Sequence, residues 1–259
     1  MRRRFGKSLA VLRLYFCGRT RIELATRLLD ERAIGRPQAR LVLAYLALAR
    51  STPVETGRLA EAIWGEDLPQ SWELSLSAVV SNLRATLTGL GLSRKSVERS
   101  SGGYALTLAP DVWVDWHAAT TALDQAEGAL RRGDARVAWG WAGIVTAVHR
   151  RPFLAGLSGD WVEGRRSVQR ALLLRGLDCF VEICSAIGEP ALALKAAEEA
   201  VDVEPFRETG HARLMRLHLE HGNRAEALRA YERCRRLIAD ELGVDPSPQL
   251  QELFAAALS

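Results

Sequence analysis

The chain has 259 residues, of which 48% are hydrophobic and 25% charged, a composition typical of a folded protein with enough apolar side chains for two domains. No apolar run reaches the length of a membrane span, and the four cysteines contain no CxxC pair, which argues against a disulfide framework. Residues 1–105 hold 17 Lys and Arg against 9 Asp and Glu, whereas residues 106–259 hold 18 against 22. A basic part joined to an acidic part suggests a polyanionic partner for the first alone, with chance surface charge as the alternative.

The first residues resemble two targeting or binding motifs without completing either. Residues 2–7 (RRRFGK) are similar to a twin-arginine export signal, but Arg13 interrupts the apolar run that follows. An export signal needs a longer apolar stretch, so we expect a cytoplasmic protein. Gly6-Lys7-Ser8 ends like a phosphate-binding loop that lacks its first glycine, so no nucleotide site is predicted there.

The next hundred residues alternate between strand and helix patterns. Residues 11–16 and 20–24 predict a hairpin, and residues 97–108 predict a second one with Gly102-Gly103 in its turn. Helices are predicted at 37–49, opened by Pro37, at 56–64, capped by Thr56, and at 71–88. In the last helix, Leu76, Val80, Leu83 and Leu87 form an apolar stripe.

This order of elements predicts a winged helix-turn-helix over residues 1–110. In that fold the third helix enters the major groove of DNA and the terminal hairpin, or wing, contacts the backbone or the minor groove. A small α+β domain without a nucleic-acid role is the alternative, and the basic charge and the helix-turn-helix joint argue against it.

Residues 111–259 are predicted to form an all-helical domain that contains a repeat. Segment 188–198 aligns with segment 222–232 at a shift of 34 residues, with six identities in eleven positions. A period of 34 residues belongs to tetratricopeptide helix pairs, which usually bind other proteins. The predicted helices are 116–132, 134–149, 160–187, 189–203, 207–221, 223–242 and 248–258. The fold class predicted is therefore mainly α with a small α+β part.

Catalytic and metal-binding chemistry find little support. His218 and His221 share a predicted helix with His211, but no carboxylate or thiol completes a metal site. No nucleophile–base pair is apparent either. We expect no enzymatic activity, no cofactor and no metal.

Three segments resemble the bacterial transcriptional activator domain proteins, which include the Streptomyces antibiotic regulatory protein family. These segments are AIWGEDLP (62–69), RPFLAGLSGDWVEGRRS (151–167) and the run 202–250. The resemblance implies a winged helix followed by a tetratricopeptide-like activator domain. It also implies a non-membrane protein that binds double-stranded promoter DNA at tandem direct repeats, as a possible homodimer. Its second partner would be RNA polymerase, contacted through sigma and alpha subunits, and its target a secondary-metabolite (antibiotic) gene cluster.

The same resemblance makes 72–88 the recognition helix and 99–104 the wing. The DNA-binding residues it implies lie on the second helix, the recognition helix and the wing: Thr56, Arg58, Ser81, Arg84 and Arg99. The side of the recognition helix opposite the apolar stripe adds Ser77 and Asn82 as candidates. Asn82 could pair with an adenine edge, and Ser77 or Ser81 with a phosphate.

The chain departs from the family at positions 82 and 85, which are often basic in relatives but are Asn and Ala here. This neutral face predicts modest affinity and steep salt dependence, with attraction supplied by basic residues around it. These are Arg2 to Arg4, Lys7, Arg36, Arg40, Arg58, Arg94, Lys95 and Arg99. The alternative function is a protein-interaction adaptor whose winged helix has lost sequence-specific DNA binding.

Overall fold

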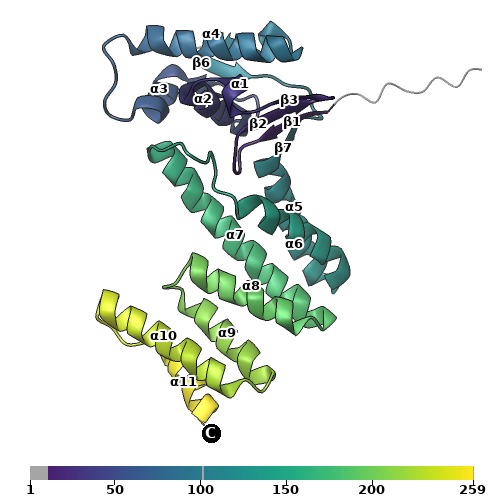
Figure 1. Ribbon diagram of the computed structural model, residues 1–259, viewed down its shortest axis with the longest axis vertical. Coiled ribbons are helices and arrows are strands. Elements are labelled where there is room, and N and C mark those ends of the chain that lie inside the picture. Colours follow the sequence, from purple (N-terminus) through teal and green to yellow (C-terminus); the bar gives the residue numbers. More distant parts are fainter. Residues whose placement is uncertain (1–10, 101, 259) are drawn as a thin grey trace, which may run out of the picture. The chain divides into compact units, whose positions relative to one another are not determined.

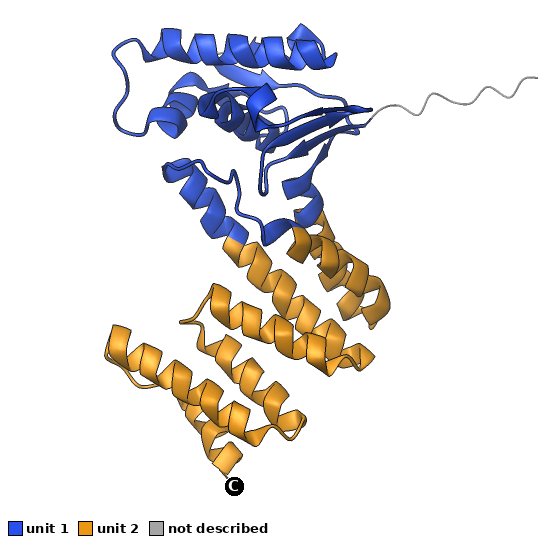
Figure 2. Cartoon of the chain, in the orientation of Figure 1, with its two compact units in different colours: residues 1–119, 148–169 blue, residues 120–147, 170–259 orange. Residues whose placement is uncertain are grey.

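The computed structural model describes residues 11–100 and 102–258 and divides them into two compact units (Figures 1 and 2). The first unit comprises residues 1–119 and 148–169, and the second comprises residues 120–147 and 170–259. None of the described helices is both long and apolar enough to cross a membrane.

The first unit opens with a four-stranded sheet of order β3-β2-β1-β7. Strands β1 (Leu12–Tyr15) and β2 (Arg21–Leu24) form the predicted antiparallel hairpin. Strands β3 (Arg27–Leu29) and β7 (Trp113–Val114) were not predicted, because two or three residues are too few to show an alternating pattern. The parallel pairing of β7 with β1 brings residue 113 beside residue 13.

Four helices and a second sheet complete the winged helix (Figure 1). The short α1 (Glu31–Ile34) precedes α2 (Pro37–Leu48), α3 (Thr56–Trp64) and α4 (Trp72–Leu90). The 3₁₀ helix η1 (Arg94–Ser96) leads into the wing strands β5 (Val97–Ser100) and β6 (Gly103–Leu106). Strand β4 (Val54–Glu55) adds a third strand, in the order β4-β6-β5. The three longer helices and the wing hairpin are therefore as predicted.

The segment 148–169 completes the core of the first unit although it is distant in sequence. Phe153 is fully buried, and its ring lies 6.5 Å from that of Phe16 and 5.2 Å from that of Trp116. Two backbone hydrogen bonds join this segment to the end of β1. The amide of Leu154 donates to the carbonyl of Phe16 (2.7 Å), and the amide of Gly18 donates to the carbonyl of Pro152 (2.8 Å).

Asp115 ties the start of the helical part to strand β1. Its Oδ2 accepts hydrogen bonds from the backbone amides of Phe16 and Cys17, both at 2.8 Å, and the residue is fully buried. Burial raises the pKa of this carboxyl, while the backbone donors and Arg151 oppose that shift. The carboxylate serves as a structural acceptor for two buried amides, which would otherwise lack partners.

The remaining chain is helical, as predicted (Figure 1). The helices are α5 (Asp115–Arg131), α6 (Ala135–His149), α7 (Asp160–Ile187), α8 (Pro190–Val203), α9 (Glu208–Glu220), α10 (Arg224–Leu242) and α11 (Pro248–Leu258). The first residues of α5 and α7 and the end of α6 belong to the first unit, and the other residues form the second.

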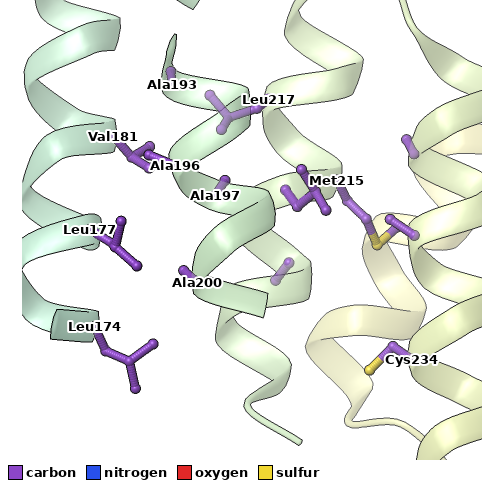
Figure 3. Packing of buried hydrophobic residues seen from close by; sticks show 14 of the residues in the cluster. Leu174, Leu177, Val181, Ala193, Ala196, Ala197, Ala200, Met215, Leu217 and Cys234 are labelled. Carbon is purple, nitrogen blue, oxygen red and sulfur yellow. The ribbon is translucent and has the colours of Figure 1, made fainter. Parts of the chain in front are cut away.

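Small side chains form the packing surface of the second unit. Figure 3 shows Ala193, Ala196, Ala197 and Ala200 of α8 among larger apolar residues such as Leu177 of α7. At Gly176 of α7, an added Cβ would lie 2.6 Å from Cγ1 of Val145, so only glycine permits this approach of α6. The alanines shared by the two repeat copies, at 193 and 227 and at 196 and 230, are buried, which agrees with the packing of tetratricopeptide repeats.

The four cysteines are free and buried, as expected for small apolar side chains. The domain boundary predicted at residue 110 stays a prediction. The two compact units divide the chain differently, since residues 148–169 pack with the N-terminal part.

Candidate nucleic-acid interface

Helix α4 presents a long exposed face. Its leucine and valine stripe, Leu76, Val80, Leu83 and Leu87, is buried in the first unit. The opposite side exposes the three polar side chains Ser77, Ser81 and Asn82. With 19 residues the helix is about 28 Å long, enough to lie in a major groove. Gly91 ends it in the left-handed conformation (φ 108°), which glycine adopts without strain.

The small residues of this face border a hollow that sequence reasoning did not find. A cavity of about 600 Å³ lies beside α4, where Ala78, Asn82 and Ala85 face Arg36 and Trp64. Because positions 78 and 85 are alanine, no long side chain fills the space. The exposed face is therefore concave and neutral along its middle, with a guanidinium at its border.

Arg84 fastens the wing to α4. Its Nε donates to the backbone carbonyl of Val97 (2.8 Å), and its guanidinium lies 5.7 Å from the centre of the Tyr104 ring. A charged donor to a carbonyl together with a cation–π contact holds the side chain in place. The geometry thus gives Arg84 a positioning role, and its predicted contact with DNA remains a prediction.

The wing depends on two adjacent glycines with different requirements. Gly102 has a φ of +80°, which a side chain rarely tolerates, and so it forms the turn. Gly103 pairs with Glu55 of β4, and a Cβ on it would lie 2.1 Å from the carbonyl oxygen of Val54. Arg99 is exposed on the wing strand β5. Ser101, also part of the predicted wing, lies outside the described residues.

The predicted capping role of Thr56 is wrong. Thr56 is the first residue of α3, the cap position is Glu55, and no side chain caps the helix. The amide and the hydroxyl of Thr56 both donate to the carbonyl of Gly102, at 3.2 and 3.4 Å. The wing turn therefore lies against the start of α3 and takes up a donor that a phosphate could have used. The sequence does not show this contact, because it joins residues 46 positions apart.

The basic side chains around α4 differ in their exposure and in their ion pairs. Arg94 and Lys95 are exposed on η1, and Arg94 lines a second hollow of about 350 Å³ with Ser81 and Arg84. Arg58 is exposed and lies 3.9 Å from the Glu55 carboxylate, a weak surface pair.

Arg40 is unavailable to DNA as placed, since it is 12% exposed and bonded to Glu31 at 3.1 Å. The predicted contributors Arg2, Arg3, Arg4 and Lys7 lie outside the described residues. Among residues 11–100 and 102–258, no three potential metal ligands gather.

These features define a class of protein: a winged helix with an exposed recognition helix, here α4, and an attached wing, followed by tetratricopeptide-like helices. The bacterial transcriptional activator domain family model matches residues 114–258. The chain belongs to this family, which confirms the resemblance seen in the sequence.

The chain is similar to bacterial regulatory proteins. The chain is 30% identical over 219 residues to regulatory protein AfsR of Streptomyces griseus, covering 85% of this chain and 22% of AfsR. It is 30% identical over 236 residues to transcriptional regulatory protein EmbR of Mycobacterium tuberculosis, and the match covers 85% of this chain and 57% of EmbR. For regulatory protein DnrI of Streptomyces peucetius the identity is 28% over 234 residues, and the match covers 85% of this chain and 83% of DnrI. The chain thus spans about a fifth of AfsR and somewhat over half of EmbR.

A solved structure shares the fold. The structure of M. tuberculosis EmbR in complex with a low-affinity phosphopeptide matches with a TM-score of 0.82 at 25% identity. The match covers 96% of this chain and 65% of that one. It confirms the fold class, a winged helix followed by tetratricopeptide-like helices.

Proposed function

We propose that this protein is a transcription activator whose winged helix binds promoter DNA and whose helical domain contacts RNA polymerase. The observation that carries the proposal is the exposed face of α4, held beside an attached wing that bears Arg99, in a chain of the activator-domain family. The names of its relatives AfsR, EmbR and DnrI, all regulatory proteins, support it.

On this proposal α4 enters the major groove. The exposed Asn82 would hydrogen-bond an adenine edge, and Ser77 and Ser81 would donate to phosphates. The alanines at 78 and 85 contribute no polar contact. Direct readout is therefore sparse, and much of the affinity comes from Arg58, Arg94, Lys95 and Arg99 around the helix.

Sparse readout favours binding as more than one copy. Two protomers on tandem direct repeats, or one protomer held by the sigma and alpha subunits of the polymerase, would compensate for a weak single contact. The regulated genes would form a secondary-metabolite cluster, as the family resemblance implies. Catalysis has no part in this mechanism.

A second candidate function rests on the neutral face of α4. If that face no longer reads bases, the chain is an adaptor that binds proteins through its helical domain. Purified protein mixed with sheared DNA of its host separates the two. Enrichment of a few promoters that share a repeat supports the activator. Uniform recovery that vanishes at moderate salt, both without and with added RNA polymerase, supports the adaptor.

The wing residue Arg99 gives the proposal a sharper test. Arg99→Ala is expected to make the slope of log K against log salt for promoter DNA shallower by about 0.9, the contribution of one phosphate contact. Binding is followed by fluorescence anisotropy at several salt concentrations. Arg136→Ala on α6, an exposed arginine of the helical part, is the matched control and should leave the slope unchanged. Equal slopes for Arg99→Ala and wild type would remove the wing from the interface.

A further inference from the structure

The N-terminal sheet carries a basic pocket that the proposed DNA contacts do not use. A cavity of about 580 Å³ lies at strands β1 to β3 and the chain between them, and four arginines line it: Arg19, Arg21, Arg27 and Arg151. None of its lining residues belongs to α3, α4 or the wing. Its volume is in the range of small-molecule sites.

The pocket has a large excess of positive charge. In the described part of the chain, none of these four guanidinium groups forms an ion pair. The one carboxylate in the lining, that of Glu23, accepts a hydrogen bond from the Tyr15 hydroxyl (2.9 Å) and lies 3.5 Å from Arg13 outside the pocket. The four guanidinium groups and the one carboxylate of the lining leave a net charge of +3. Two groups act on the lining from outside it, Arg13 on Glu23 and the buried Asp115 carboxyl on Arg151, and their opposite charges leave this balance unchanged. Like charges gathered in a hollow repel one another unless an anion compensates them.

One wall of the pocket is fixed in place by the backbone. Arg151 comes from the segment that docks on β1, where the amide of Gly18 donates to Pro152 (2.8 Å) and the amide of Ala155 donates to Gly18 (3.2 Å). The two segments lie so close together that a Cβ on Gly18 would be 3.4 Å from Cδ of Arg151. The backbone of Arg151 is therefore placed before any ligand binds, which lowers the entropy cost of forming the site.

We propose that this pocket binds a small molecule carrying a diphosphate, of the nucleoside diphosphate class. A diphosphate group carries about three negative charges, which matches the excess in the pocket, and the planar guanidinium fork pairs with phosphate oxygens in bidentate fashion. The ring of Tyr15 and the side chain of Leu28, which is 57% exposed, offer apolar surface to the rest of the ligand. A hollow suits a compact anion, whereas a duplex backbone requires an extended basic stripe.

The test uses the full chain and two probes, inorganic pyrophosphate and ADP, titrated calorimetrically without divalent cations. We expect saturable binding at one site. The double variant Arg21→Ala/Arg27→Ala should weaken the Kd at least tenfold. The matched variant Arg32→Ala, an exposed arginine of α1 outside the pocket, should bind as wild type does. Circular dichroism spectra confirm that both variants are folded.

Two outcomes would overturn the proposal: neither probe binds to the wild type, or the double variant binds both probes as the wild type does. If neither probe binds and the double variant also loses affinity for promoter DNA, these arginines contact the DNA backbone instead.

Discussion

His149 is buried without a hydrogen-bonding partner. It is 3% exposed, and within the described residues neither ring nitrogen has a partner. Its ring packs edge-on against Trp116 at 5.5 Å. Burial lowers its pKa to about 4, because the charged imidazolium loses its hydration in the protein interior. The residue behaves as an aromatic core side chain that stays neutral at physiological pH.

This lowered pKa predicts a pH dependence of stability. Between pH 6.5 and about 4 the unfolded chain binds a proton at His149 that the folded chain does not, so the free energy of unfolding falls as the pH is lowered through that range. The loss from this residue amounts to about 3 kcal/mol. His149→Phe should remove that part of the loss and leave stability at pH 7 unchanged or higher. Urea unfolding at pH 7 and pH 4.5 measures both; an equal acid loss in the variant would contradict the assignment.

His117 adds to the same trend. Burial, with a smaller contribution from Arg50, lowers its pKa to about 4 as well. The acid sensitivity of His149→Phe is therefore reduced and not abolished.

The buried alanines shared by the two repeat copies set the spacing between neighbouring helices. Ala227 of α10 is fully buried, and its counterpart Ala193 holds the same place in α8. Each has no room for a larger side chain in a close-packed core. The exposed alanines at 191 and 225, also shared by the two copies, carry no such constraint.

Ala227→Leu is expected to destabilise the second unit by about 1–3 kcal/mol, since three extra carbons must displace neighbouring helices. Ala225→Leu, on the same helix but exposed, should change stability by less than about 0.5 kcal/mol. Chemical denaturation of both variants gives the comparison. Similar losses for the two would mean that the alanine positions do not control the packing.

Over the whole chain, the N-terminal unit depends on residues beyond the winged helix. Phe153 lies about forty residues after the predicted boundary, yet its ring contacts Phe16 and Trp116 and lies 5.6 Å from Trp161. Trp161 in turn stacks on Tyr45 of α2 at 4.5 Å. We infer that a fragment cut at residue 110 would lack Trp116, Phe153 and Trp161 and would leave Phe16 and Tyr45 without their aromatic partners.

Phe153→Ala is therefore expected to destabilise the N-terminal unit by about 3–5 kcal/mol. Hydrogen exchange should show faster exchange in β1 and β2, although the substitution lies outside the winged helix in sequence. Phe206→Ala, at a position that is 43% exposed in the second unit, serves as control and should leave those amides protected. If the amides of β1 and β2 stay as protected in Phe153→Ala as in the wild type, the winged helix does not depend on the Phe153 contacts.

Much of the fold was predictable because its elements carry local patterns. The stripe of α4, the proline at the start of α2 and the 34-residue repeat each depend on nearby residues. The strands β3, β4 and β7 were missed because two or three residues show no period and form only through pairing with distant partners.

The candidate interface was predicted in outline and altered in detail. The spacing along α4 correctly predicted that Ser81 and Asn82 lie on the exposed side, since a helix fixes which residues share a face. The bonds of Arg84 to the wing and of Arg40 to Glu31 could not be foreseen, because a long side chain chooses among partners brought together by folding.

The order of the elements and the exposed face of α4 are thus readable from periodicity and local composition, and the family from the segments that resemble its members. Folding sets which arginines remain free of ion pairs, places residues 148–169 in the first unit and brings four arginines to one pocket. Each of these depends on contacts between segments far apart in the chain, and such contacts leave no periodic trace in the sequence.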